Sequence, residues 1–342
     1  MNTNNTAFTL EIVHDSKPDH LTEDTYLALT DEGSVILAVA DGAPQRVKTS
    51  GSMRPLLDRY SADMTPGGYA ARFTRDRLRE LFTEQPDRDL TSAVLAVNTE
   101  LGEDLKAIYG GELTTDTVLA AEPDLPFLAE DPRFIRLVLP VCCITVARVD
   151  VQNQQLEVAH GADTALFFFH DDGRVEQVTP DQMEQHDHRA LSVAQRLFHE
   201  SGETDYNAWR APVARAADIR NGIYHNFENP DGTPDASVGV GVMNGLPQLE
   251  HYLFTATRSL EGVAGILLAS DGIYWASPLE TAQETLTERL LLMRQKIEAH
   301  GLSHYVAEKR DYDQQTFPAS QYPVIGRNDD ITGIYARILN PA

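Results

Sequence analysis

Four acidic motifs in this sequence lie where apolar segments begin or end. VILAVADG and ILLASDG each run into an aspartate followed by a glycine, whereas the acidic pairs in LTEDTYLAL and RNDDITGIY directly precede apolar residues. The residues of the four motifs are Glu23 and Asp24, Asp41 and Gly42, Asp271 and Gly272, and Asp329 and Asp330. A carboxylate beside a buried segment is costly unless a partner offsets its charge. Four such motifs at the ends of apolar segments indicate one shared acidic pocket, in which a common partner would offset their charge.

A pocket lined by carboxylates suits hard divalent cations such as Mg²⁺ and Mn²⁺. These ions take oxygen ligands and usually keep several waters, so about two or three carboxylates can suffice for each ion. Two ions about 3.5–4 Å apart can share one carboxylate and activate a water for attack on phosphorus. A glycine after the aspartate would let its backbone carbonyl approach a metal. At any single motif Asp-Gly is also an ordinary turn signal, so the metal interpretation depends on all four motifs together.

Strands and helices are predicted in blocks along the chain. Apolar patterning predicts early strands over AFTLEIVHDS, TYLALTD and SVILAVADG, and later short strands over ITVARVDV, QLEVAHGAD, TALFFFHDDG and RVEQVTP. Apolar residues at helical spacing predict helices over YAARFTRDRLRELF and LTSAVLAVNTELGEDLKAIY. The last third predicts the strand GILLAS, a helix from about residue 279 to 300, a loop, and the strand ITGIYARIL. This grouping favours an α+β architecture over a doubly wound parallel sheet.

The domain organisation is interpreted as a single domain over residues 1–342, because no linker or tandem repeat interrupts the pattern. Residues 111–135 are acidic and contain prolines, which predicts a loop or an insertion. Residues 181–235 are polar and rich in His and Asp, with one or two helical stretches, which predicts a flap-like segment.

The composition is strongly acidic, with 28 basic and 52 acidic residues and a formal net charge of −24. Such a field repels nucleic acid and anionic membranes, although it could favour cations or basic partner segments. No segment approaches about 18 uninterrupted apolar residues, and the polar start MNTNNTAFTL does not resemble a secretory signal. We therefore expect a cytoplasmic monomer without a nucleic-acid or membrane partner. The adjacent Cys142 and Cys143 lie in an apolar run and are predicted to be buried, not to form a disulfide or a zinc site.

The order and flanks of the acidic motifs resemble those of the metal-dependent type 2C serine/threonine protein phosphatases. The matching segments are TED, ADG, ASDG and NDDIT. Between them, VAHGADTALFFFHDDGRVEQVTPDQ is similar to that family's Gly-Asp-Ser segment and hairpin, and VGVMNG is similar to the stretch before its Ser-Asp-Gly strand. The resemblance spans about residues 8–340. It implies a central β-sandwich of two antiparallel sheets flanked by helices.

The resemblance also implies an enzyme that removes phosphate from phosphoserine and phosphothreonine proteins and uses two Mn²⁺ or Mg²⁺ ions. Asp41 would bridge both ions, and Gly42 would offer its carbonyl to one of them. Asp271 and Asp329 would complete the shell of the other ion. A bridging hydroxide would then attack the phosphoryl group in line, without a covalent phosphoenzyme.

Three further acidic residues have outer roles in this resemblance. Glu23 or Asp24 would act through metal-bound water. Asp163, which matches the aspartate of the Gly-Asp-Ser segment, would be a candidate for a third, weaker metal site.

The sequence departs from the family where substrate is handled. The phosphate-gripping arginine that usually lies shortly before the aspartate of the first motif is replaced by His20, with Lys17 and Arg46 nearby. Pro44 stands where the family commonly continues with glycines, and Arg46 could take part of the phosphate role. Asp330 stands where the family usually has asparagine, which adds a charge beside a proposed ligand.

The general acid is not assigned. His20 and His160 are candidates because they lie near the motifs in sequence, but a histidine on an alternating strand is more often a hydrogen-bonded structural residue. His186 and His188 are spaced for one face of a strand, where they could bind metal or form part of a solvated surface.

Two alternatives keep the same acidic motifs but change the function. The departures at the phosphate grip are compatible with a catalytically weak phosphatase-like module that binds a phosphorylated partner or acts as a regulator. A small phosphorylated metabolite could also replace the phosphoprotein as substrate. Other enzyme classes lack support, since the sequence has no P-loop, no Gly-x-Ser-x-Gly, no Cys-x-x-Cys and no His-Glu-x-x-His.

Overall fold

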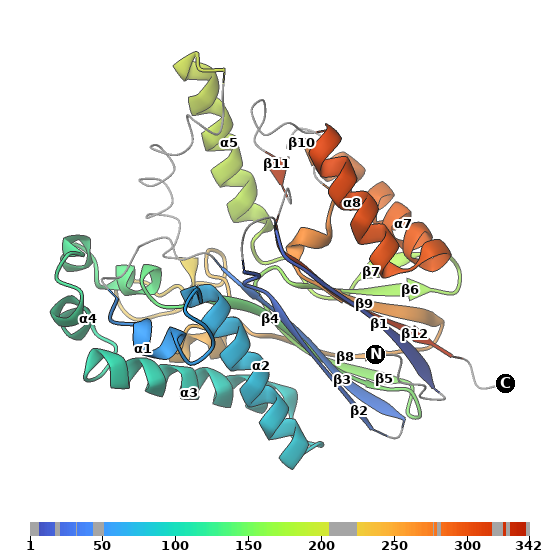
Figure 1. Cartoon of the computed structure of the whole chain (residues 1–342), viewed down its shortest axis with the longest axis horizontal. Helices are drawn as coiled ribbons and strands as arrows, with labels where there is room; N and C mark the ends of the chain where they lie inside the picture. Colours follow the sequence, from blue (N-terminus) through green and yellow to red (C-terminus); the bar gives the residue numbers. More distant parts are fainter. Residues whose placement is uncertain are drawn as a thin grey trace.

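Two five-stranded antiparallel sheets lie face to face at the centre of the molecule (Figure 1). The computed structural model describes residues 7–17, 21–31, 33–43, 51–204, 224–275, 277–278, 282–316, 324–325 and 329–339. The first sheet has the order β2-β3-β4-β5-β8, with bounds Thr25–Asp31, Ser34–Gly42, Cys142–Asp150, Gln155–Gly161 and Phe254–Ser259. The second has the order β1-β12-β9-β6-β7, with bounds Phe8–Asp15, Ile331–Ile338, Val263–Ala269, Ala165–His170 and Val175–Gln177. A separate short pair consists of β10 (Ser277–Pro278) and β11 (Val324–Ile325).

The continuous apolar run of β3 is explained by burial on both of its faces. One set of alternate residues packs toward the helices outside the sheet, namely Ile36, Ala38 and Ala40. The other set packs between the two sheets, namely Val35, Leu37 and Val39. Because side chains alternate across a strand, a strand covered on both sides needs apolar residues throughout. The same division holds in β9 and β6, whose residues are shared between the layer inside the sandwich and the layer beneath the C-terminal helices.

Helices cover the outer faces of both sheets, with α2 and α3 over the first and α7 and α8 over the second (Figure 1). The α-helices are α1 (Arg54–Leu57), α2 (Pro66–Glu84), α3 (Leu90–Tyr109), α4 (Thr115–Ala121), α5 (Glu184–Ser201), α7 (Ala282–His300) and α8 (Leu302–Thr316). Short 3-10 helices are η1 (Pro126–Ala129), η2 (Pro132–Leu137), η4 (Pro247–His251) and η5 (Asp271–Ile273). The start of α2 follows ordinary capping rules, because the Thr65 side chain accepts the Gly68 N–H at 3.0 Å and Pro66 begins the helix.

The predicted α+β sandwich is confirmed, but two local predictions are corrected and one strand was missed. Residues 111–135 are not an irregular loop, because they contain α4, η1 and most of η2 and bury Val118, Leu125 and Leu128, while their interpretation as an insertion remains a prediction. The loop expected after residue 300 begins instead as the helix α8. The strand β8 was not predicted at all. The single-domain interpretation and the flap-like segment at 181–235 remain predictions, and residues 205–223 of that segment lie outside the described residues.

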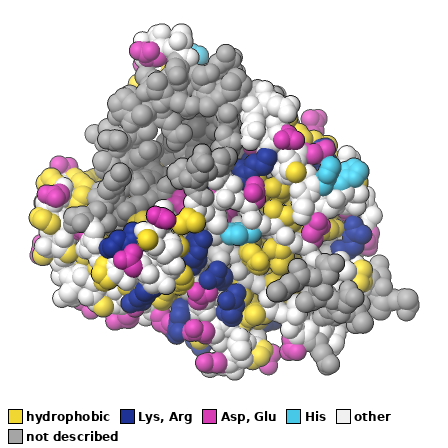
Figure 2. Space-filling model, in the orientation of Figure 1, with side chains coloured by type: hydrophobic (Ala, Val, Ile, Leu, Met, Phe, Trp, Pro, Cys, Tyr) yellow, Lys and Arg dark blue, Asp and Glu magenta, His cyan; other side chains and the backbone are white. Residues whose placement is uncertain are grey.

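The buried thiols agree with the expectation from the sequence. Cys142 and Cys143 are both buried and free. On the face shown in Figure 2, Asp and Glu side chains are spread among Lys and Arg and do not form one acidic patch. In the described ranges, no helix combines the length and apolar character needed to cross a membrane.

Candidate metal and phosphate site

Strand pairing brings the acidic motifs together in two pairs. In the first sheet, Thr25 of β2 pairs with Ala40 of β3, so Asp24 lies beside Asp41. In the second sheet, Gly333 of β12 pairs with Ala269 of β9, so the motif before β12 lies beside the motif after β9. Each pair arises because antiparallel neighbours place the end of one strand next to the start of the other.

The two pairs then meet across the sandwich, because β12 and β9 of the second sheet contact β3 of the first. Asp24 of the first sheet lies beside Ser270 and Thr332 of the second. The carboxylates whose charges act on Asp41 come from both sheets and from the β5–β6 turn: Asp24, Asp271, Asp163 and Asp329. The structure therefore gathers the predicted acidic residues into one site.

The glycines of the two Asp-Gly motifs permit close approach of backbones. A Cβ on Gly42 would lie 2.7 Å from the carbonyl oxygen of Glu23. A Cβ on Gly272 would overlap the carbonyl oxygen of Asp330. Each Asp-Gly motif is thus packed directly against the backbone of its acidic partner motif. This close packing explains why both positions require glycine, whether or not the Gly42 carbonyl binds a metal.

Replacing Gly272 with alanine should destabilise the fold by about 3 kcal/mol, because the added methyl group must push the Asp330 backbone away. Urea unfolding followed by circular dichroism measures this change. Gly111→Ala is the matched control, since the nearest atom to its new methyl group, Thr117 Cγ2, would lie at an ordinary 3.4 Å. Equal stability of the two variants would show that η5 is not held by this contact.

Asp24 is the most deeply buried of the predicted acidic residues. It is 1% exposed, and neither of its carboxylate oxygens makes a hydrogen bond of ordinary geometry in the described structure. Burial, together with the nearby charge of Asp330, raises the pKa of Asp24 to about 7. Asp24 interacts with Ser270, Asp41 and Thr332. Because a buried charged carboxylate is costly, a bound cation nearby would stabilise its charged form.

Asp41 experiences the strongest repulsion in the site. Loss of hydration, followed by the charges of Asp24 and Asp271, holds the pKa of Asp41 well above its usual range. A divalent cation would offset these charges, and an all-oxygen donor set suits Mg²⁺ and Mn²⁺. Among the described residues, no three His, Cys, Asp or Glu side chains already lie close enough to hold one ion by themselves.

Asp329 lies at the exposed edge of the site, where Lys17 joins it. The Asp329 side chain is 51% exposed, and the Nζ atom of Lys17 lies 3.4 Å from its Oδ1. The same Nζ lies 3.8 Å from Oε2 of Glu23. Although burial opposes it, the charges of Asp329 and Asp330 raise the pKa of Lys17, so this side chain stays cationic. Burial raises the pKa of Glu23.

Asp330 holds the segment that precedes β2, which explains its charge. It is 2% exposed, its Oδ1 accepts the backbone N–H of Lys17 at 2.8 Å, and its Oδ2 accepts that of Glu23 at 2.7 Å. An asparagine has only one acceptor oxygen and could not accept both bonds in this way. Asp330, which replaces the asparagine of the family pattern, therefore fixes the backbone that carries Lys17 and Glu23.

Asp163 lies after a strained residue at the turn between β5 and β6. Ala162 has a φ of 71°, which is uncommon for a residue with a side chain. The Gln182 side chain fixes this turn, because its Oε1 accepts the N–H of Ala162 at 3.2 Å and that of Gly241 at 2.8 Å. Burial raises the pKa of Asp163, and its Oδ1 is buried without a hydrogen bond. Asp163 thus has a free acceptor, while its role at a third metal remains a prediction.

The structure places three of the histidine candidates, His160, His186 and His188. His160 is fully buried, with Nδ1 2.9 Å from Oγ1 of Thr145 and Nε2 2.8 Å from the carbonyl of Pro180. Burial lowers the pKa of His160 to about 4, so it is a neutral structural residue and not a general acid. His186 and His188 lie in α5 and not in a strand, and His186 stacks on Tyr224.

Two proposed substrate-handling residues, His20 and Arg46, lie outside the described residues. The structure adds two arginines of α2 that the sequence did not single out. Nη2 of Arg72 donates to the Thr22 carbonyl at 2.9 Å, and Nη1 of Arg75 donates to Thr25 Oγ1 at 3.0 Å. These bonds hold the segment that carries Glu23 and Asp24. No local motif marks them, because they depend on how α2 lies against β2.

Known structures match this fold over nearly the whole chain. Serine/threonine phosphatase Stp1 from Staphylococcus aureus is 14% identical, with 97% of this chain and 95% of that chain covered and a TM-score of 0.51. A bacterial serine phosphatase is also 14% identical, with 97% and 98% covered and a TM-score of 0.50. The catalytic domain of the serine threonine protein phosphatase PstP, solved with two manganese ions, is 14% identical, with 98% and 99% covered and a TM-score of 0.47.

Sequence comparison alone does not find these relationships. No protein-family model matches the chain, and no curated protein matches it either. At identities this low, the likeness concerns the arrangement of the backbone. Over nearly its whole length, the chain has the fold of the type 2C serine/threonine phosphatases that its acidic motifs resemble.

Proposed function

We propose that this chain is a Mg²⁺- or Mn²⁺-dependent phosphomonoesterase that acts on phosphoserine and phosphothreonine in proteins. The observation that carries the proposal is the convergence of four acidic motifs from two sheets, with the Asp24 carboxylate buried beside Asp41, Ser270 and Thr332. Solved structures with the same fold are named a serine/threonine phosphatase and a serine phosphatase, which supports this class of substrate. The combination favours phosphate chemistry over a purely structural role for the carboxylates.

Each acidic residue has a defined part in this proposal. Asp41 and the Gly42 carbonyl, with Asp271 and Asp329, would hold two ions. Glu23 or Asp24 would hold metal-bound water, and Asp163 would serve a third, weaker site. When bound, the ions would supply an activated water for attack on phosphorus and offset the charge of the phosphate.

The cationic residues at the rim of the site would bind the phosphate itself. The Lys17 ammonium is fixed at the exposed edge through the hydrogen bond from its backbone to Asp330. Its charge can attract a phosphate that the strongly acidic protein would otherwise repel. Lysine acts as a point charge and not as a bidentate fork, so orientation of the phosphate would need a further donor. Arg46 and His20 stay proposed for that role.

A second candidate function is a phosphatase-like module that binds phosphoprotein with little or no turnover. One observation favours it, since Lys17 already places the chain's own cation between Asp329 and Glu23. A cation tethered there could weaken binding of a metal to those two carboxylates. Binding of Mn²⁺ by calorimetry without phosphate release from any substrate would support this candidate over the enzyme.

The substrate class is tested by comparing phosphopeptides with small phosphorylated metabolites in the presence of Mn²⁺. We expect kcat/KM to be at least about tenfold higher for a phosphothreonine peptide than for free phosphothreonine or glycerol phosphate, because residues that flank the phosphate add binding energy. Phosphate release measures both rates. A metabolite hydrolysed faster than every peptide would contradict the protein substrate while leaving the metal chemistry intact.

A further inference from the structure

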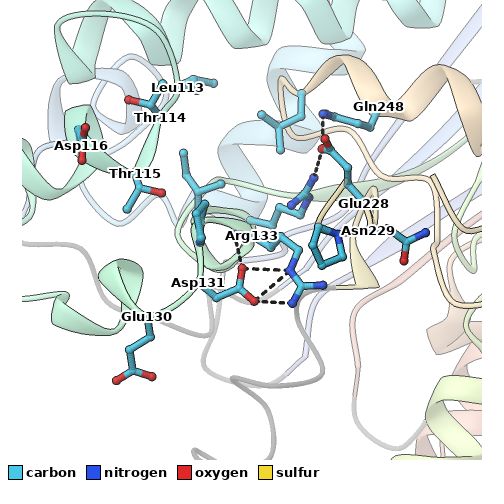
Figure 3. A pocket seen from close by; sticks show the side chains of 15 residues that line it. Leu113, Thr114, Thr115, Asp116, Glu130, Asp131, Arg133, Glu228, Asn229 and Gln248 are labelled. Atoms are coloured by element: carbon cyan, nitrogen blue, oxygen red, sulfur yellow. Dashed lines mark hydrogen bonds and ion pairs between the residues drawn. The ribbon is translucent and has the colours of Figure 1, made fainter. Parts of the chain in front are cut away.

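A cavity of about 740 Å³ lies apart from the acidic motifs, between α4, η2 and the segments around residues 229 and 248 (Figure 3). Figure 3 shows Thr115, Asp116 and Glu130 on one side of it, and Glu228, Asn229 and Gln248 on the other. Its volume lies within the range of typical ligand sites. The two arginines in its lining, Arg133 and Arg136, are already engaged by protein groups.

The engaged groups leave little capacity to bind an anion. Arg133 forms a bidentate pair with Asp131, in which Nε donates to Oδ1 at 3.0 Å and Nη2 donates to Oδ2 at 2.5 Å. Arg136 is 4% exposed and donates to the Asn226 carbonyl at 3.0 Å and to Oε2 of Glu228 at 2.8 Å. Gln248 Nε2 donates to that same Oε2 at 2.7 Å. Both guanidinium charges are therefore neutralised by adjacent carboxylates.

The groups that remain free in the cavity can accept hydrogen bonds. Gln248 Oε1 and Thr115 Oγ1 are buried atoms without a hydrogen bond in the described structure. Asp116 and Glu130 are exposed carboxylates, and within the described ranges neither forms an ion pair. Unmet acceptors and uncompensated negative charge together favour a ligand that donates hydrogen bonds and carries positive charge.

The apolar part of the lining indicates that the ligand is a long basic side chain. Leu113, Ile135, Pro132, Pro230 and Leu246 contribute apolar surface beside the acceptors. Arginine and lysine place their methylene stems along such surface while the charged end reaches polar groups. Arginine fits better, because its five donors can serve acceptors on more than one side.

The wall of the cavity is connected to the acidic site through neighbouring backbone segments. Gly42 pairs with Cys142, which pairs with Met243. Beside Met243, the Val242 carbonyl accepts from Asn226 Nδ2 at 2.9 Å, and the Asn226 carbonyl accepts from Arg136. The two backbone pairings from Gly42 to Met243 span about 10 Å, and the hydrogen bonds through Asn226 to Arg136 lengthen the path to about 14 Å. An extended peptide covers that distance in about four residues.

We propose that this cavity binds an arginine of the phosphoprotein substrate, about four residues from the phosphorylated side chain. The inference rests on the proposed function for its substrate, but the binding itself does not require catalysis. The cavity would thus select basic phosphorylation sites, in agreement with the strongly negative charge of the chain.

The test uses two labelled peptides without phosphate, identical except for arginine or citrulline, its uncharged analogue, at the fourth position from the threonine. Fluorescence anisotropy with the full-length chain at low salt measures both dissociation constants. We expect the arginine peptide to bind about tenfold more tightly, the size of a charge-assisted hydrogen bond. Equal affinities, or no binding of either peptide, would overturn the proposal.

Variants of the exposed carboxylates locate the effect. The double variant D116N/E130Q should remove most of the preference for arginine, whereas Asp124→Asn, an exposed control in the same region that does not line the cavity, should keep it. A preference that survives in D116N/E130Q places the binding elsewhere and rejects the cavity. Phosphate release from the phosphorylated peptides with Mn²⁺ is measured in parallel. Absence of turnover with an intact arginine preference would reject the proposed function and keep the cavity site.

Discussion

Replacing Asp41 with asparagine should abolish metal-dependent phosphate release, with a loss in kcat/KM of about a thousandfold or more. Asparagine keeps the shape of the side chain but removes the charge on which the acidic site converges. Without that charge the site should bind a divalent cation far more weakly. Phosphate release from a phosphothreonine peptide or a generic aryl phosphate, measured with added Mn²⁺, gives the result.

Two controls separate this loss from misfolding. Asp150 is the last residue of β4 and pairs with Ser34, at the end of the β3–β4 ladder far from Asp41, so Asp150→Asn should leave turnover unchanged. In metal-free buffer, Asp41→Asn should be more stable than the natural chain, because it removes one of several carboxylates that repel each other. Undiminished turnover in Asp41→Asn would reject the assignment of the site.

The stability of the metal-free chain should fall as the pH rises from about 4 to about 7. Burial raises the pKa of Asp24 from 3.8 to about 7, so in this range the folded chain holds a proton that the unfolded chain has lost. The stabilisation is fully present below the unfolded pKa and disappears as the pH passes the folded pKa. For this fully buried group the effect is on the order of a few kcal/mol.

Urea unfolding at pH 5 and pH 8 in the presence of a chelator measures this dependence. Mn²⁺ at pH 8 should restore stability, because it binds the ionised carboxylates of the folded chain. Asp24→Asn should flatten the pH profile, while Asp124→Asn, at an exposed position, should not change it. A metal-free chain that becomes more stable toward pH 8 would contradict the buried position of Asp24.

The grouping of strands and helices predicted the α+β class, and the resemblance to the type 2C phosphatases implied the sandwich. β3 and β9 are apolar throughout, since both faces of each are covered, and each ends at an Asp-Gly pair. The grouping of acidic motifs was also predictable, because carboxylates at the ends of such strands need partners. The sequence could not show why Gly42 and Gly272 must be glycines, because their close contacts are made with backbone that is far away in the sequence.

Three elements were not predicted because their residue patterns do not indicate the secondary structure that tertiary contacts stabilise. α8 buries Lys309 and Asp313 as an ion pair of 2.6 Å, so part of its core-facing surface is charged and its apolar periodicity is weak. α4 is only seven residues long and begins with a capping box between Thr114 and Thr117 inside an acidic, proline-containing segment. β8 is an edge strand that alternates half-buried and exposed residues. The role of Asp330 required knowledge of two distant backbone N–H groups.

The most direct test of the metal site is a calorimetric titration of Mn²⁺ into the metal-free chain, with Asp41→Asn measured beside it. We predict saturable binding of about two ions per chain for the natural sequence and loss of at least one of them in the variant. Binding that is absent in the natural chain, or identical in both proteins, would contradict the proposal that the four acidic motifs form a metal site.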